Sequence, residues 1–118
     1  MNVLYVALGS ALGGVCRYLV SLALNAPKGF PWGTFAVNVA GALAIGLLSG
    51  WLAKGEHAAT IRLFAVVGFC GGFTTFSTFS NEAFKMLESA QWGQAAVYVL
   101  GSVFAGLAAV ALGYLVSR

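Results

Sequence analysis

Four long apolar stretches divide this chain of 118 residues and constrain its fold more than any other feature. They cover roughly residues 3–24, 32–53, 61–87 and 94–116, and each reaches the about 20 residues that an α-helix needs to cross a bilayer. The chain is 60% hydrophobic and only 8% charged, so it could not cover a water-exposed surface with polar groups. We therefore expect an all-α integral membrane protein, with residues 1–118 forming one domain of four transmembrane helices.

The ends of these stretches carry the residues expected at a membrane surface. Trp32, Trp51 and Trp92 each lie at the end of a stretch, where amphipathic rings prefer the headgroup level. No positively charged segment precedes the first stretch and Arg17 lies inside it, so we interpret it as a retained helix rather than a cleaved signal peptide.

The basic residues give almost no orientation signal. If the helices alternate across the membrane, Lys54, Arg62 and Arg118 lie on one side and Lys28 and Lys85 on the other. Orientation is set by an excess of Lys and Arg on the cytoplasmic side, and this division is nearly even. We therefore expect insertion both ways up and pairing of the two forms as an antiparallel, dual-topology homodimer. The same residues are too scattered to bind the phosphate backbone of a nucleic acid.

Two polar residues within the spans share helix faces with small residues. Arg17 follows Gly9 and Gly13 at intervals of four, and Asn38 precedes Gly46 on its own face. Small residues allow close helix packing in lipid, so both side chains are expected to point into the protein. A charged or polar group at this depth is functional by default. Arg17 could either bind a backbone carbonyl of a neighbouring helix or contact an anion. Asn38 could either form an interhelical hydrogen bond or donate hydrogen bonds to an anion.

The third span is the most unusual part of the chain. The adjacent glycines Gly71 and Gly72, followed by β-branched threonines, predict a break of the helix near the middle of the membrane. Backbone freed there must be satisfied by protein, water or an ion, so a break predicts an ion site. Close packing against the glycines is the alternative.

Phenylalanines recur at every third residue beyond the glycine pair, with Thr and Ser residues between them. Phe73, Phe76 and Phe79 would lie along one side of the helix. Ring edges are positively polarised and could meet an anion together with the hydroxyl donors, although such a stripe more often serves packing.

Groups for other chemistry are missing from the predicted spans. Glu56, Glu82 and Glu88 are expected at span ends, which leaves no carboxylate to relay protons in a drug/proton antiporter. The sequence has no Asp, and its two cysteines and single histidine form no metal-binding pattern. We therefore expect a protein that is not an enzyme.

Three segments resemble one known family, the bacterial fluoride ion channels called Fluc or CrcB. They are Gly-Gly-Val-Cys-Arg-Tyr at 13–18, Thr-Phe-Ala-Val-Asn-Val-Ala-Gly at 34–41 and Gly-Phe-Cys-Gly-Gly-Phe-Thr-Thr-Phe-Ser-Thr-Phe at 68–79. The resemblance covers the whole chain in length and span count. It implies an antiparallel homodimer in the bacterial inner membrane, with two fluoride pathways and one structural sodium ion that is not transported. Such a channel lets cytoplasmic fluoride leave passively and so confers fluoride resistance.

The resemblance also assigns roles by position. The backbone carbonyls of Gly71 and Thr74 resemble the sodium ligands, and Arg17 resembles an arginine near one vestibule. The expected fluoride pathway consists of Asn38, Phe76, Phe79, Ser77, Thr78, Tyr98 and Ser102.

Two other interpretations remain open at this stage. A small multidrug exporter has a similar size and dual topology but needs a carboxylate within the membrane. A scaffold protein that conducts nothing would tolerate isoleucine at Phe76 or Phe79.

Overall fold

The computed structural model describes residues 1–25, 29–52 and 58–118, which contain helices and turns but no strand. The helices are α1 (Asn2–Leu24), α2 (Trp32–Trp51), α3 (Ala58–Ile61), the π-helical η2 (Arg62–Cys70), α4 (Gly71–Phe73), α5 (Phe76–Glu88) and α6 (Trp92–Ser117). Within these residues, four helical stretches are long and apolar enough to cross a membrane, with α3 to α5 forming the third. The four-span, all-α prediction is confirmed. Ala53, the expected end of the second span, and the loop residues Lys28 and Lys54 lie outside the described residues.

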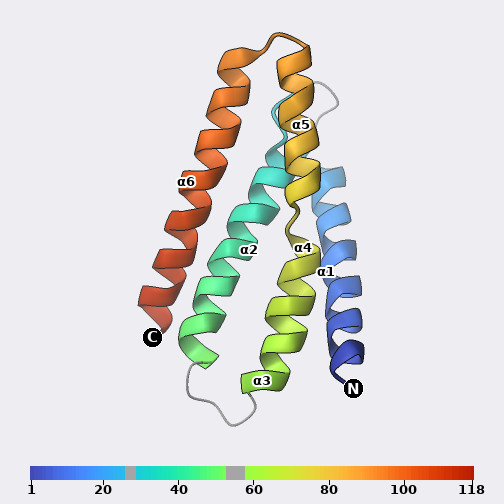
Figure 1. Ribbon diagram of the computed structural model, residues 1–118, viewed down its shortest axis with the longest axis vertical. Coiled ribbons are helices and arrows are strands. Elements are labelled where there is room, and N and C mark those ends of the chain that lie inside the picture. Colours follow the sequence, from blue (N-terminus) through green and yellow to red (C-terminus); the bar gives the residue numbers. More distant parts are fainter. Residues whose placement is uncertain (26–28, 53–57) are drawn as a thin grey trace.

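The spans run alternately up and down the bundle. Figure 1 shows both chain termini and α3 at one end, and the turn from α5 to α6 at the other. Helix α2 packs along α6, and α1 packs along η2 and α4. The break between α4 and α5 therefore lies beside α2, between these two helix pairs.

Glycines allow the closest of these helix contacts. A Cβ atom added at Gly13 of α1 would overlap the carbonyl oxygen of Phe69 in η2, and one at Gly46 of α2 would overlap that of Val110 in α6. The expected protein-facing role of small residues is confirmed at these sites. Gly101 and Gly106 of α6 differ, because no described atom lies within 4 Å of a Cβ built there.

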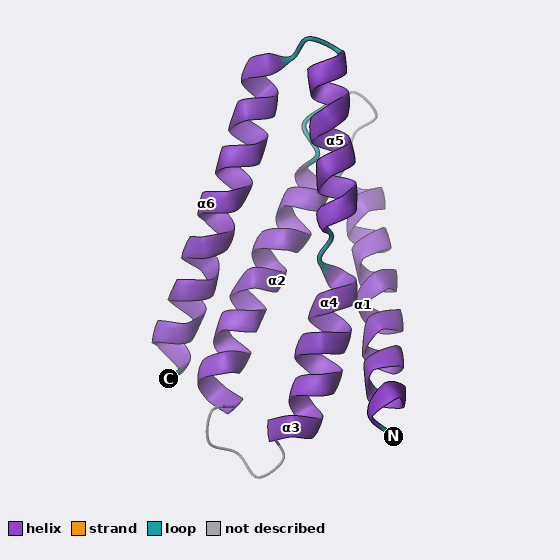
Figure 2. Cartoon of the chain, in the orientation of Figure 1, coloured by secondary structure: helices purple, strands orange, loops and turns teal. Residues whose placement is uncertain are grey.

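The break in the third span lies after the glycine pair rather than at it. Gly71 has helical angles, φ −62° and ψ −38°. The chain becomes extended at Thr74, with ψ 160°, and at Thr75, with φ −151° and ψ 122°. Figure 2 shows this segment as a short loop between α4 and α5. The predicted break is confirmed, but the extended residues are the threonines, because Thr75 has hydrogen-bond partners outside its own helix.

Helix α5 ends in a tight turn that leads to α6. The N–H of Gln91 donates to the carbonyl of Met86 at 2.8 Å, and the N–H of Ala90 to that of Leu87 at 3.1 Å. These two bonds form a Schellman cap, whose left-handed position usually holds glycine. Here Ala90 occupies it with φ 59°, the one positive φ angle among the described residues.

Candidate functional site: the broken third span

Asn38 of α2 binds both backbone groups of Thr75 at the break. Its Nδ2 donates to the Thr75 carbonyl at 3.1 Å, and the Thr75 N–H donates to its Oδ1 at 2.8 Å. Asn38 therefore forms an interhelical hydrogen bond, which is one of the two roles that the sequence predicted for it. An amide NH₂ has two N–H donors, so one donor remains for another acceptor.

Two further contacts satisfy the segment around the break. The Nε–H of Arg17 in α1 donates to the Gly72 carbonyl at 3.1 Å, so Arg17 acts as the carbonyl clamp that the sequence allowed. The Thr75 hydroxyl accepts from the Thr78 N–H at 3.2 Å and caps the N-terminus of α5.

These contacts divert the usual donors from two carbonyls. In an uninterrupted α-helix the Thr75 N–H would bond to the Gly71 carbonyl, and the Thr78 N–H to the Thr74 carbonyl. Here the Thr75 N–H bonds to Asn38 and the Thr78 N–H to the Thr75 hydroxyl. The two carbonyls expected to bind sodium therefore lose their regular helical partners, whereas Gly72 has Arg17.

A cavity of about 280 Å³ lies beside the break, and we call it the inner cavity. Four of the predicted pathway residues line it together with the backbone of the break: Asn38, Phe76, Phe79 and Ser102. The Ser102 hydroxyl is buried and has no hydrogen-bond partner among the described residues. The inner cavity thus holds unused donors from Asn38 and Ser102 beside two aromatic rings.

The other predicted pathway residues lie outside this lining. Ser77 is exposed and Thr78 is half-buried, and neither is among the lining residues. Tyr98 is 0% exposed and lies behind Phe79, with ring centroids 4.9 Å apart. Phe76 lies 6.1 Å from Phe79 and is 79% exposed.

Tyr98 connects the inner cavity to a carboxylate that the sequence analysis did not include in the site. Its hydroxyl donates to Glu82 Oε1 at 2.9 Å, and the Thr34 hydroxyl donates to Glu82 Oε2 at 3.1 Å. Glu82 lies within the third span, six residues before the end of α5. The prediction that it lies at the span end is therefore only approximately correct. Thr34 lies in the first turn of α2, and Glu82 and Tyr98 each lie six residues from the ends of α5 and α6 that meet at the same end of the bundle. This shared end was the available signal.

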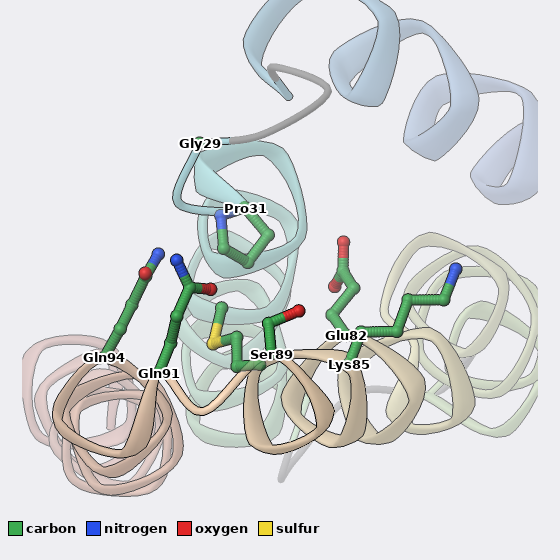
Figure 3. A pocket seen from close by; sticks show the side chains of 8 residues that line it. Gly29, Pro31, Glu82, Lys85, Ser89, Gln91 and Gln94 are labelled. Carbon is green, nitrogen blue, oxygen red and sulfur yellow. The ribbon is translucent and has the colours of Figure 1, made fainter.

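A second cavity, of about 450 Å³, opens beyond Glu82, and we call it the outer cavity. Figure 3 shows polar side chains around it from the end of α5 and the start of α6. They are Glu82, Lys85, Ser89, Gln91 and Gln94.

Four apolar spans that enclose a polar break define a multi-pass membrane protein of the ion-transport class, since polar groups at this depth mark ion pathways. The chain belongs to the CrcB family: residues 4–114 match the family described as CrcB-like protein, Camphor Resistance (CrcB).

Named relatives cover nearly the whole chain. One from Methylobacterium nodulans, called Fluoride-specific ion channel FluC, is 50% identical over 120 residues, covering 100% of this chain and 97% of its own. A relative of the same name from Novosphingobium aromaticivorans is 43% identical, covering 97% of this chain and 94% of its own. The expected family and the multi-pass bacterial membrane setting are confirmed.

Proposed function

We propose that two antiparallel copies of this chain form a passive, fluoride-selective channel in the bacterial inner membrane, which exports cytoplasmic fluoride and confers fluoride resistance. The observation that carries the proposal is the inner cavity, where Asn38 and Ser102 lie beside Phe76 and Phe79 at a break in the membrane-spanning helix. The names of the relatives support the same ion.

The lining of the inner cavity suits a small, strongly hydrated anion. Fluoride entering a narrow path loses water, and the amide and hydroxyl donors of Asn38 and Ser102 replace it. The positively polarised ring edges of Phe76 and Phe79 add attraction without a full charge. Several weak contacts let an ion leave as readily as it enters, as conduction requires.

A second copy of the chain would enclose this path. Phe76, a lining residue, is 79% exposed in the single chain, and Gly101 and Gly106 have open space on α6. An exposed apolar side chain and bare helix backbone each favour a close helix contact in lipid. The nearly even division of basic residues supports the antiparallel arrangement.

The break also suits a structural sodium ion between the two copies. The carbonyls of Gly71 and Thr74 lack their regular helical donors, because the N–H groups of Thr75 and Thr78 bond elsewhere. Unwound carbonyls of this kind coordinate sodium in membrane transport proteins. Two carbonyls from each copy would hold the ion, which would fix the break and not be transported.

Fluoride efflux from liposomes that contain the purified protein tests this function. A potassium ionophore carries the counter-charge, and chloride serves as the control anion. We expect rapid fluoride efflux without chloride efflux, and a loss of activity when N-methylglucamine replaces sodium on both sides. Absence of fluoride efflux from verified dimers in sodium would refute the channel. Efflux that does not depend on sodium would refute the sodium site alone.

A further inference from the structure

Two side chains, Phe79 and Tyr98, lie between the linings of the inner and outer cavities. Phe79 lines the inner cavity and packs on Tyr98, with ring centroids 4.9 Å apart. The Tyr98 hydroxyl bonds to Glu82, and Glu82 lines the outer cavity. Beyond Phe79, Tyr98 and Glu82 are therefore the next polar side chains in this series of contacts.

Glu82 is an obstacle to an anion on this route. Its two carboxylate oxygens accept hydrogen bonds from Thr34 and Tyr98, which are almost completely buried hydroxyl donors. An ionised carboxylate at this position repels a second anion at close range.

Lys85 is the cation that lies closest to this obstacle along α5. Both side chains line the same cavity, and Figure 3 shows that of Lys85 extending to one side of Glu82. Lys85 is exposed and lines the outer cavity. Its ammonium group is therefore free to act on ions in the outer cavity.

We propose that the outer cavity is a mouth of the fluoride pathway and that Lys85 offsets the charge of Glu82 there. This inference rests on the proposed channel function and adds a residue to it. The positive charge raises the local concentration of anions and lowers the barrier that Glu82 would otherwise impose. Because the effect passes through water, it is screened by salt.

Substitutions at Lys85 test the proposal in the liposome efflux assay. At an ionic strength of about 10 mM, K85Q is expected to slow fluoride efflux about threefold, the effect of one unit charge about 7 Å away through water. K85E is expected to slow fluoride efflux about sevenfold, whereas K85R is expected to match the wild-type rate. Near 1 M salt the differences in efflux rate between these variants are expected to vanish. The control R118Q removes the same charge at the other end of α6. Since an antiparallel dimer shows one such mouth to each side, protein orientation in the vesicle does not matter.

A double substitution separates the offset from a merely structural role. The E82Q substitution removes the negative charge that Lys85 is proposed to offset. Adding K85Q to E82Q is therefore expected to change fluoride efflux much less than K85Q does in the wild-type protein. An equal slowing in both backgrounds would overturn the offset. A K85Q efflux rate equal to that of R118Q at low salt would also overturn the offset. If the wild-type protein conducts fluoride in the same assay, the proposed channel function would stand.

Lipid headgroups are the other anions that Lys85 could meet. The same comparison in neutral phosphatidylcholine vesicles is expected to give the same slowing. A slowing confined to vesicles with anionic phosphatidylglycerol would show that Lys85 acts on headgroups, and would overturn the proposal. A wild-type protein that conducts no fluoride would refute the channel and this mouth together.

Discussion

Asn38 and Thr75 hold each other by two hydrogen bonds of opposite direction, at 3.1 Å and 2.8 Å. One side chain thereby satisfies both backbone groups of a residue whose helix partners are lost. Lipid offers no alternative partner for such groups, so the break depends on α2 being in place. The same side chain keeps one donor beside the inner cavity, so it joins the stability of the break to the proposed pathway.

Replacing Asn38 with alanine is expected to destabilise the protein by about 2–3 kcal/mol, because two buried backbone groups lose their partners. Thermal unfolding in detergent measures this as a lower Tm. Asn81→Ala is the matched control, since Asn81 is exposed on α5. Equal Tm values for the two variants would contradict the bridging role of Asn38.

Replacing Phe79 with isoleucine is expected to slow fluoride efflux by at least about tenfold, or about 1.4 kcal/mol on the barrier, while the dimer persists. The aliphatic side chain fills similar space but offers no polarised ring edge. Efflux and size-exclusion chromatography are measured together. Phe84→Ile removes an exposed ring from α5 outside the cavity lining and is expected to conduct normally. Unchanged efflux in Phe79→Ile would favour a ring that serves packing alone.

Replacing Thr34 with valine is expected to cost about 1–2 kcal/mol, because the shape is kept and the donor to Glu82 is lost. Thr34 is 1% exposed, so water cannot readily replace its hydroxyl. Comparison of Tm values with the exposed Thr60→Val checks the effect. A Thr34→Val protein as stable as wild type would mean that Tyr98 alone suffices to hold the carboxylate.

Replacing Gly13 with alanine is expected to destabilise the protein by about 1–3 kcal/mol, because the new Cβ overlaps the Phe69 carbonyl and forces α1 away from η2. The neighbouring Gly14→Ala is the control, since no described atom lies within 4 Å of its Cβ position. Thermal unfolding distinguishes the two. A larger loss for Gly14→Ala would contradict the packing of α1 described above.

Replacing Ala90 with glycine is expected to stabilise the α5–α6 turn by about 0.5–1 kcal/mol. A left-handed conformation costs a residue with a Cβ about 1–2 kcal/mol, and part of this gain is lost to the greater freedom of glycine when unfolded. A higher Tm is the expected result. Ser89→Gly, one residue earlier at φ −85°, removes a side chain without relieving strain and is expected to lower Tm.

The spans were predictable because their signal is local. Continuous apolar residues and terminal tryptophans placed the fourth span at 94–116, close to the observed Trp92–Ser117. The position of the break was not fully predictable, because Gly71 can adopt helical angles as well as extended ones. The contacts of Thr75 decide it, and these come from a side chain 37 residues away.

Within the candidate site, residue types were easier to predict than their environments. Asn38, Phe76, Phe79 and Ser102 line one cavity, as a shared pathway requires. The fluoride roles of all seven predicted pathway residues stay predictions. Glu82 was missed because a carboxylate near a span end commonly faces water. Its inward orientation follows from Thr34 and Tyr98 on two other helices. The π-helical winding of η2 likewise gave no local signal.

The contacts at the break also suit the order in which a ribosome delivers the chain to the membrane. Arg17 and Asn38, whose side chains satisfy Gly72 and Thr75, both precede the third span in sequence. Synthesis proceeds from the N-terminus, so both partners exist before the interrupted segment emerges. The half before the break, α3 to α4, and the half after it, α5, are each shorter than the about 20 residues needed to cross alone. The third span must therefore enter the bilayer as one unit, beside helices that already carry its missing hydrogen-bond partners.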